Sequence, residues 1–339
     1  MHIEKNRLTK LENTIKVSKM ISDDKLKEQL QYTLNETDLK IGEKYDGKVR
    51  DSYTIDDNRI IITTDRISAF DRVLCTLPFK GQVLNQLAAF WFERTKGTIP
   101  NHFIEMPDPN VLLAHECKLV PIEIIVRGYL TGSTKTSAWY NYKNGVREFC
   151  GNTLPEGMTE HQKFETPIIT PTTKAPKGEH DESISKKEIL EQGLVKPELY
   201  EQIEKVALEL FKIGTEHLAK NNLILVDTKY EFGLLDGKLV LIDEIHTPDS
   251  SRFWIKDTYE SRLKEGKDPQ KLDKEYVRKY LADQGFLGDG DIPEIPEDVK
   301  IEAAKRYIQA YEMITGKQFE AEVGDVSERI KKNLGKFLE

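Results

Sequence analysis

Hydrophobic and charged residues alternate along positions 223–235, the pattern of a β-strand whose two faces differ. Asp227, Lys229 and Glu231 fall on one face of this predicted strand, and Thr, Tyr and Phe side chains fall on the other. Three charges on one side of an otherwise apolar strand require a compensating ion, ligand or partner charge. The segment therefore predicts a strand that lines a charged patch.

A hairpin is predicted where Asp-Gly at 236–237 reverses the chain into a second strand that ends in Asp243 and Glu244. The residues leave two registers open. A two-residue turn would place Glu244 opposite Lys229, whereas a three-residue loop with a left-handed Gly237 would place Asp243 there. In either register three carboxylates and one lysine converge, which suits Mg²⁺ with substrate phosphates or a simple ladder of ion pairs.

Elsewhere the pattern favours strands early in the chain and helices late. With little strict β-α alternation, this order indicates an α+β fold rather than a doubly wound sheet. Strands are expected in residues 40–65, a second strand pair in 115–129, a long Pro-, Thr- and Gly-rich loop in 150–182, and helices in 25–34, 82–94, 197–221, 271–284 and 296–315.

The 339-residue chain is acidic, with a formal net charge of −8. This charge argues against a dedicated nucleic-acid binder, although a few local cations can still form an anion pocket. No apolar run approaches the ~18 residues of a membrane span, and the N-terminus lacks the apolar core of a signal peptide. The three cysteines lack metal-ligand spacing, so neither a disulfide framework nor structural zinc is expected. We expect a cytoplasmic protein that binds neither membranes nor nucleic acids.

Other stretches have the chemistry of anion binding. Residues 47–50 join a glycine to two basic side chains, which suits nucleotide phosphates. Residues 127–133 combine an arginine fork with two glycines and a hydroxyl, and Arg252 follows the acidic hairpin. The polar run 65–72 is either a ligand-binding loop or a capped turn. Taken singly, each stretch is also compatible with an ordinary turn or surface strand.

Together and in this order, these stretches resemble the SAICAR synthetase (phosphoribosylaminoimidazole-succinocarboxamide synthase) family from about residue 42 to residue 254. The most specific matches are residues 68–71, 127–133, 227–233 and 243–254. The segment 172–182 and the chain length resemble the longer, fungal type of this family.

The resemblance implies an α+β fold with a kinase-like, β-rich N-terminal lobe, a larger α+β C-terminal lobe and an active-site cleft between them. We expect an N-terminal extension in residues 1–40, a nucleotide-binding lobe in 41–121, and a lobe with the substrate and metal sites in 122–339. A monomer is expected.

The implied activity is an ATP-dependent ligation that needs Mg²⁺. It joins the carboxylate of carboxyaminoimidazole ribonucleotide (CAIR) to the amine of L-aspartate through an acyl phosphate, giving SAICAR, ADP and phosphate. Two alternatives remain open: another ATP-dependent phosphotransferase, although the His-Arg-Asp and Asp-Phe-Gly motifs of protein kinases are missing from the sequence, and a nucleotide-binding relative without catalytic activity.

The resemblance also assigns roles to individual residues. Lys229, Asp227 and Asp243 are expected to be catalytic, and Glu231 and Asp243 to hold Mg²⁺, which favours the register that places Asp243 on the charged face. ATP contacts are expected from Gly47, Lys48, Arg50 and Lys229, and from Glu123 in the segment where a kinase-like hinge would lie. Substrate contacts are expected from Ser68, Asp71, Arg127, Ser133, Lys174, Asp181, Arg252 and Arg278.

Overall fold

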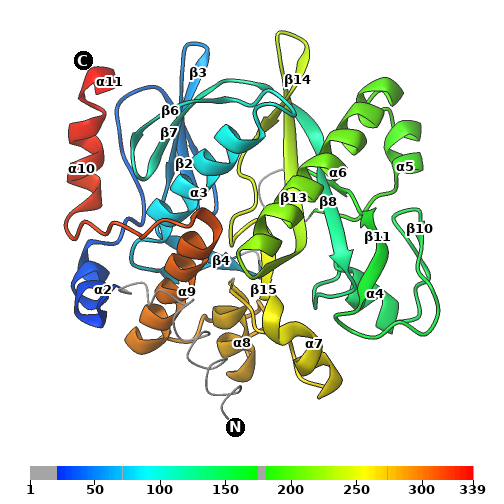
Figure 1. Cartoon of the computed structure of the whole chain (residues 1–339). Coiled ribbons are helices and arrows are strands. Elements are labelled where there is room, and N and C mark those ends of the chain that lie inside the picture. Colours follow the sequence, from blue (N-terminus) through cyan, green and yellow to red (C-terminus); the bar gives the residue numbers. More distant parts are fainter. Residues whose placement is uncertain (1–20, 71, 175–180, 273, 339) are drawn as a thin grey trace, which may run out of the picture.

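The computed structural model describes residues 21–70, 72–174, 181–272 and 274–338. Two large antiparallel sheets, two two-stranded sheets and the helices packed around them form an α+β fold (Figure 1). The fold class predicted from the sequence is therefore confirmed. No helix in the described part of the chain is both long enough and apolar enough to cross a membrane.

The first sheet has five strands in the order β1-β2-β3-β7-β6. Its strands are β1 (Glu43–Asp46), β2 (Arg50–Ile55), β3 (Asn58–Thr63), β6 (Phe103–Asp108) and β7 (Val111–His115). The strands predicted in residues 40–65 are thus present. Helix α3 (Lys80–Thr95) packs on this sheet. Helix α10 (Val326–Asn333), near the end of the chain, runs beside the sheet, and its Arg329 pairs with the buried Asp108.

The second sheet is built on two long strands, β8 (Lys118–Tyr129) and β13 (Leu223–Leu235). Their neighbours are β11 (Lys163–Ile169), β12 (Thr172–Thr173), β14 (Lys238–Ile242) and β15 (Ser251–Ile255). The strand pair predicted in residues 115–129 is wrong, because this segment is mainly the single strand β8. The long loop predicted in residues 150–182 is also partly wrong, because β11 and β12 pair with β8 there. The edge of β8 that faces away from β13 offers unpaired backbone groups. Pro- and Thr-rich segments can pair with these groups although their local sequence gives a weak strand signal.

Helix α6 (Pro197–Lys220) crosses β13 and β8 and covers one face of the second sheet (Figure 1). Its bounds agree with the predicted helix in residues 197–221. Helix α9 (Glu297–Thr315) confirms the helix predicted in residues 296–315, and it packs against α3. The remaining elements are α2 (Asp23–Gln29), η1 (Leu30–Tyr32), β4 (Arg66–Ala69), β5 (Arg72–Thr76), α4 (Ala138–Lys143), β9 (Glu148–Phe149), β10 (Asn152–Thr153), α5 (Lys186–Glu191), α7 (Lys256–Lys264), α8 (Glu275–Asp283) and α11 (Gly335–Leu338).

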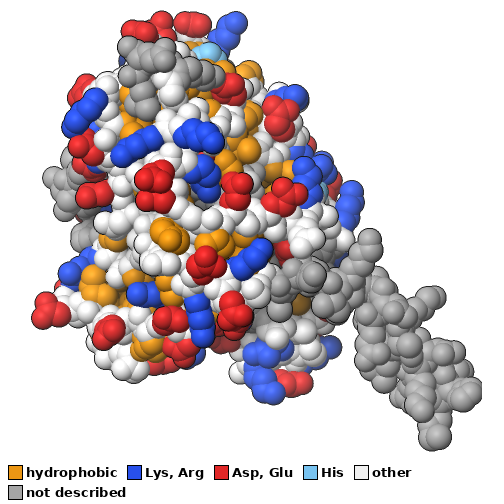
Figure 2. Space-filling view, turned by 90° about the vertical axis from the view of Figure 1, so that its left-hand side faces the viewer, with side chains coloured by type: hydrophobic (Ala, Val, Ile, Leu, Met, Phe, Trp, Pro, Cys, Tyr) orange, Lys and Arg blue, Asp and Glu red, His pale blue; other side chains and the backbone are white. Residues whose placement is uncertain are grey.

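One apolar core joins both sheets. It contains Trp91 of α3, Leu112 of β7, Ile124 of β8, Leu210 of α6 and Tyr307 of α9, all of them buried. Because these side chains belong to one contiguous cluster, the two sheets are held in a fixed relation. On the face shown in Figure 2, acidic and basic side chains of the described residues are interspersed.

Candidate active site

A cleft of about 1690 Å³ is lined by residues of both sheets. Most of the predicted site residues line it: Gly47, Lys48, Arg50, Ser68, Glu123, Arg127, Lys174, Asp181, Asp227, Lys229, Glu231, Asp243, Arg252 and Arg278. Ser133 is exposed and does not line the cleft, although Thr134 and Ser137 do. Asp71 lies outside the described residues.

The hairpin formed by β13 and β14 has the two-residue turn. Leu235 pairs with Lys238, so Asp236 and Gly237 form the turn, with φ angles of 51° and 76°. Positive φ at both positions is the type I′ geometry that matches the twist of a hairpin. The register that the family resemblance favoured is therefore wrong, because the turn lacks the third residue that register needs.

Asp243 nevertheless reaches the charged face. Strand β14 ends at Ile242, and Asp243 has a left-handed φ of 67°, which turns its side chain into the cleft. Its Oδ2 lies 3.8 Å from the Nζ of Lys229. The predicted convergence of Lys229 and Asp243 is present, but a turn in the chain produces it rather than the strand register.

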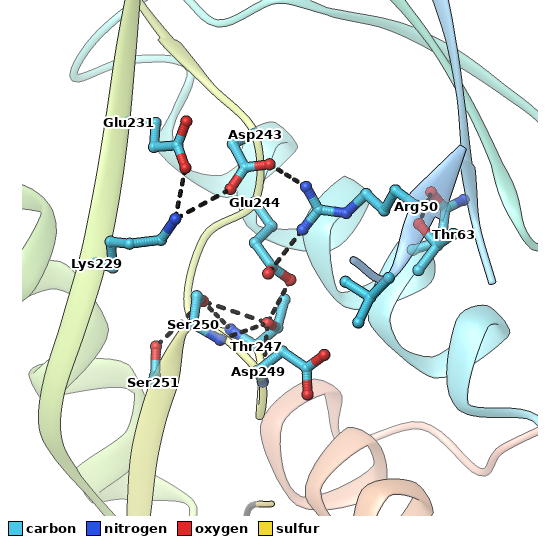
Figure 3. A network of polar contacts seen from close by, with 12 residues as sticks. Arg50, Thr63, Lys229, Glu231, Asp243, Glu244, Thr247, Asp249, Ser250 and Ser251 are labelled. Atoms are coloured by element: carbon cyan, nitrogen blue, oxygen red, sulfur yellow. Dashed lines mark hydrogen bonds and ion pairs between the residues drawn. The ribbon is translucent and has the colours of Figure 1, made fainter. Parts of the chain in front are cut away.

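Carboxylates and cations around Glu231, in the second half of β13, form an acidic network (Figure 3). We use this name for Glu123, Glu231, Asp243 and Glu244 together with Lys174, Lys229 and Arg50. Lys229 Nζ lies 2.8 Å from Glu123 Oε1 and 2.5 Å from Glu231 Oε1. Lys174 also pairs with Glu231. Arg50 of β2 bridges Asp243 and Glu244, with 2.6 Å between its Nη2 and Glu244 Oε1.

Charge interactions within the acidic network keep its central pair ionised. Burial alone would lower the pKa of Lys229, but Glu231, Glu123 and Asp243 raise it well above the ordinary lysine value. Burial alone would raise the pKa of Glu231, but Lys229 and Lys174 bring it below the ordinary glutamate value. Lys229 is therefore a fixed cation at neutral pH and is poorly suited to accept a proton.

A second cluster, the arginine row, lies nearer the start of β13. Asp227 accepts hydrogen bonds from Arg127 Nη1 at 3.2 Å and from Arg252 Nη1 at 2.5 Å. Arg127 also donates to Thr170 Oγ1 at 2.7 Å and to the carbonyl oxygen of Thr136 at 2.9 Å. Two guanidinium groups that converge on one carboxylate present a fixed set of N–H donors, which suits a phosphate or carboxylate ligand.

The donor set fits a metal ion that arrives with a phosphate ligand. Within the described residues, no three His, Cys, Asp or Glu side chains stand close enough together to hold a metal ion by themselves. Glu231 and Asp243 both lie close to the ammonium group of Lys229, so their two carboxylates could bind the same metal ion beside it. Mg²⁺ is commonly held by one or two carboxylates together with substrate phosphates.

The structure also adds residues to the cleft that received no role from the sequence. Glu244 is buried beside Arg50, and its Oε2 accepts a 2.5 Å hydrogen bond from Thr247. Lys274 lines the cleft and donates to the carbonyl oxygen of Asp249, whose carboxylate pairs with the fully buried Lys80 at 2.7 Å. Glu244 stands next to Asp243 in the sequence, which was a usable signal. The long-range pair of Lys80 and Asp249 has no local sequence signal.

Arg278 lies at another part of the cleft wall, on helix α8. It pairs with Glu275, and its guanidinium lies 5.6 Å from the centre of the Phe70 ring. Phe70 follows directly after β4, so this contact brings residues 68–70 of the predicted segment and Arg278 to the same side of the cleft.

Comparisons with known proteins match the chain to one enzyme family. A sequence profile described as SAICAR synthetase matches residues 43–291. The phosphoribosylaminoimidazole-succinocarboxamide synthase of Legionella pneumophila (strain Paris) is 48% identical over 313 residues, which cover 91% of this chain and 100% of that protein. The enzyme of the same name from Bacteroides thetaiotaomicron is 50% identical over 313 residues, covering 90% of this chain and 98% of that protein.

Solved structures give the same result. The SAICAR synthase from Saccharomyces cerevisiae complexed with SAICAR matches with a TM-score of 0.74 and 32% identity, covering 85% of this chain and 100% of that chain. A SAICAR synthetase in complex with ADP matches with a TM-score of 0.63 and 28% identity, covering 82% of this chain and 100% of that chain.

Proposed function

The chain belongs to the SAICAR synthetase family of ligases in purine biosynthesis, and we propose that it uses ATP to join L-aspartate to the carboxylate of CAIR. SAICAR, ADP and phosphate would be the products. One observation carries the proposal: a single cleft contains both the arginine row and the acidic network, four residues apart along β13. An anionic nucleotide and a metal–ATP complex require these two kinds of surface side by side.

The reaction would proceed in two steps. A carboxylate is a poor electrophile, so an oxygen of the CAIR carboxylate would first attack the γ-phosphorus of ATP and release ADP. The aspartate amine would then attack the acyl carbon of this acyl phosphate, displace phosphate and lose a proton. The first step depends mainly on positioning and charge neutralisation.

Lys229 would act as a hydrogen-bond donor in the first step. Its raised pKa keeps the ammonium group protonated, so it can donate to the transferred phosphoryl group and to the attacking carboxylate. Glu231 and Asp243 would hold Mg²⁺ together with the phosphates. The ion would neutralise negative charge on the phosphoryl group when bound.

The remaining residues would bind the substrates. We assign Gly47, Lys48, Arg50 and Glu123 to ATP, because all of them line the cleft around the acidic network. The arginine row would take an anionic group of CAIR, with Asp227 fixing its two guanidinium groups. The other proposed substrate contacts are Ser68, Asp71, Lys174, Asp181 and Arg278, together with Ser133, whose side chain lies outside the cleft lining of this structure. In this proposal the N-terminal lobe comprises residues 41–121 and the C-terminal lobe residues 122–339.

An ADP-release assay tests the proposal directly. The reaction contains ATP, Mg²⁺, CAIR and L-aspartate, and each component is omitted in turn. We expect ADP release only when all four are present, with SAICAR as the product. ADP release without aspartate would instead identify a kinase or an ATPase, and ATP binding without turnover would identify a relative that has lost its chemistry.

A further inference from the structure

The turn after β14 has a backbone conformation that residues other than glycine disfavour. Asp243 has a φ of 67° and His246 a φ of 49°. Residues in this region persist only where the surrounding contacts over-determine them. The turn of residues 243–246 also contains Glu244, so its shape decides where both carboxylates of the segment point (Figure 3).

A regular continuation of β14 would send Asp243 to the wrong side of the sheet. Ile242 pairs with Glu231, so the next residue of an extended strand would face the opposite side, together with the fully buried Tyr230. An unpaired carboxylate in that apolar core would be strongly unfavourable. The left-handed residue instead directs Asp243 towards Lys229.

His246 occupies the buried side in its place. Its side chain is completely buried, and its Nε2 lies 2.6 Å from the hydroxyl oxygen of Tyr230. Trp91 of α3 packs edge-on against the imidazole, with 4.6 Å between the ring centres. Burial lowers the pKa of His246 to about 3, so the ring is neutral at physiological pH. Among the described protein atoms, Tyr230 is the hydrogen-bond partner of Nε2, and Nδ1 has none.

Helix α6 makes room for this ring. Gly214 lies in the interior of α6, where glycine is intrinsically less favourable than alanine. A Cβ atom at this position would lie 2.4 Å from His246 Cε1 and 2.8 Å from its Nδ1. Since no side chain fits there while the ring stays in place, Gly214 and His246 form one close contact between α6 and the turn.

We propose that His246 is a positioning residue of the cleft: Tyr230 and Gly214 hold its ring, and the ring fixes the turn that directs Asp243 to Lys229 and Glu244 to Arg50. His246 acts through these carboxylates and lies on the opposite side of β13 from the cleft. Its effect on catalysis rests on the proposed function of Asp243, whereas its effect on the turn does not.

The first test measures the turn itself, without any ligand. Tyr230→Phe removes the hydroxyl and keeps the ring. We expect deuterium exchange in the peptide that covers residues 241–250 to become about tenfold faster or more. The reason is that the turn loses the hydrogen bond between Tyr230 and His246, one of the contacts that hold its conformation. Tyr259→Phe is the matched control, since it removes a buried 2.7 Å hydrogen bond to the carbonyl oxygen of His161 at another site. Unchanged exchange in Tyr230→Phe, or equal acceleration in the control, would overturn the proposal.

The second test separates positioning from a general loss of stability. The amide nitrogen of glutamine can reach the position of Nε2, whereas that of asparagine reaches only the position of Nδ1. We expect His246→Asn to weaken the binding of Mg·ADP by about tenfold or more, and His246→Gln to keep it within about threefold, as for supporting residues around metal ligands. Titration calorimetry with Mg·ADP measures both. Equal losses in the two variants would contradict the proposal.

Gly214→Ala should also weaken Mg·ADP binding, because the added methyl group displaces the ring. If this variant does not fold, the exchange measurement on Tyr230→Phe still decides the question. A wild-type protein that makes no SAICAR would overturn the proposed function alone, since the exchange experiment needs neither substrate nor turnover.

Discussion

Two rows of side chains lie on the same face of β13, four residues apart, and they carry opposite charge. In the arginine row, Asp227 stands between Arg127 of β8 and Arg252 of β15. In the acidic network, Glu231 stands directly opposite Glu123 of β8. Four residues of a strand span roughly 13 Å, so both rows fit into one cleft.

The difference between the rows comes from the neighbouring strands. Alternation along β13 fixes which face a charge is on, but the strands beside it decide whether cations or carboxylates accumulate. Two arginines on one aspartate attract an anion. Two glutamates opposite each other repel, and they tolerate this only because Lys229 and Lys174 lie between them. A metal cation that arrives with a phosphate ligand can also compensate this repulsion between the glutamates.

Removing one carboxylate from the acidic network should have the largest effect. Asp243→Asn keeps the size of the side chain and removes the charge that pairs with Arg50 and faces Lys229. We expect kcat/KM for ADP release to fall at least about a hundredfold, as when one preorganised electrostatic contact is lost. Raising the Mg²⁺ concentration should recover part of this loss.

Asp236→Asn is the matched control. It makes the same chemical change in the same hairpin, at a turn position with a φ of 51° that asparagine accepts readily. Wild-type activity is expected. Equal losses in both variants would mean that the hairpin fold, rather than the charge of Asp243, is responsible, and full activity in Asp243→Asn would exclude a catalytic role.

Lys229→Ala tests the central cation of the acidic network. The substitution removes the proposed donor to the phosphoryl group and leaves the facing glutamates with less compensation. We expect kcat to fall by about a hundredfold, and added Mg²⁺ should not restore it, unlike the loss in Asp243→Asn. Steady-state kinetics of ADP release measure both effects. Lys238→Ala, an exposed lysine on β14 of the same hairpin, is the control. A wild-type kcat in Lys229→Ala would remove the proposed role.

Arg127→Ala tests the arginine row, and its effect should appear in a different parameter. The variant loses charged hydrogen bonds to an anionic group of CAIR, so we expect KM for CAIR to rise about thirtyfold, with a smaller change in kcat. Arg147→Ala is the control, because Arg147 pairs with Glu156 away from the cleft lining. An unchanged KM for CAIR would contradict the role of Arg127. A decrease in kcat alone would mean that Arg127 contributes to the chemical step, as we propose for the acidic network, rather than to the binding of CAIR.

The sequence alone predicted the elements that local pattern determines. Alternation identified β13 and its charged face, the spacing of apolar residues identified α6, and the Asp-Gly pair identified the hairpin. Strands β11 and β12 were missed because their pairing with β8 depends on distant residues. The division of the charged face into two rows was missed for the same reason, since Arg127 and Glu123 come from another strand.

The turn after β14 marks another limit of the sequence. The family resemblance placed Asp243 correctly on the charged face but through the wrong register. The left-handed turn that brings it there depends on Tyr230, Gly214 and Trp91, which belong to three different elements. Alternation along β13 and β14 does not encode such a turn.

The opposite face of β13 provides the last and smallest prediction, which concerns stability. Burial lowers the pKa of His246 to about 3 from an ordinary value of 6.5, so the unfolded chain binds this proton more readily than the folded protein. The contribution to stability is therefore complete above pH 6.5 and decreases as the pH falls towards 3. At pH 5.5 the loss in the free energy of unfolding should be about 1.4 kcal/mol.

Urea unfolding at pH 7.5 and 5.5 should show a smaller acid-induced loss of stability for His246→Gln than for the wild type. Part of the loss will remain, because His102 is buried with a pKa lowered to about 4. Equal losses in both proteins would mean that the imidazole is protonated without cost, and the buried side of β13 would then tolerate charge as the cleft side does.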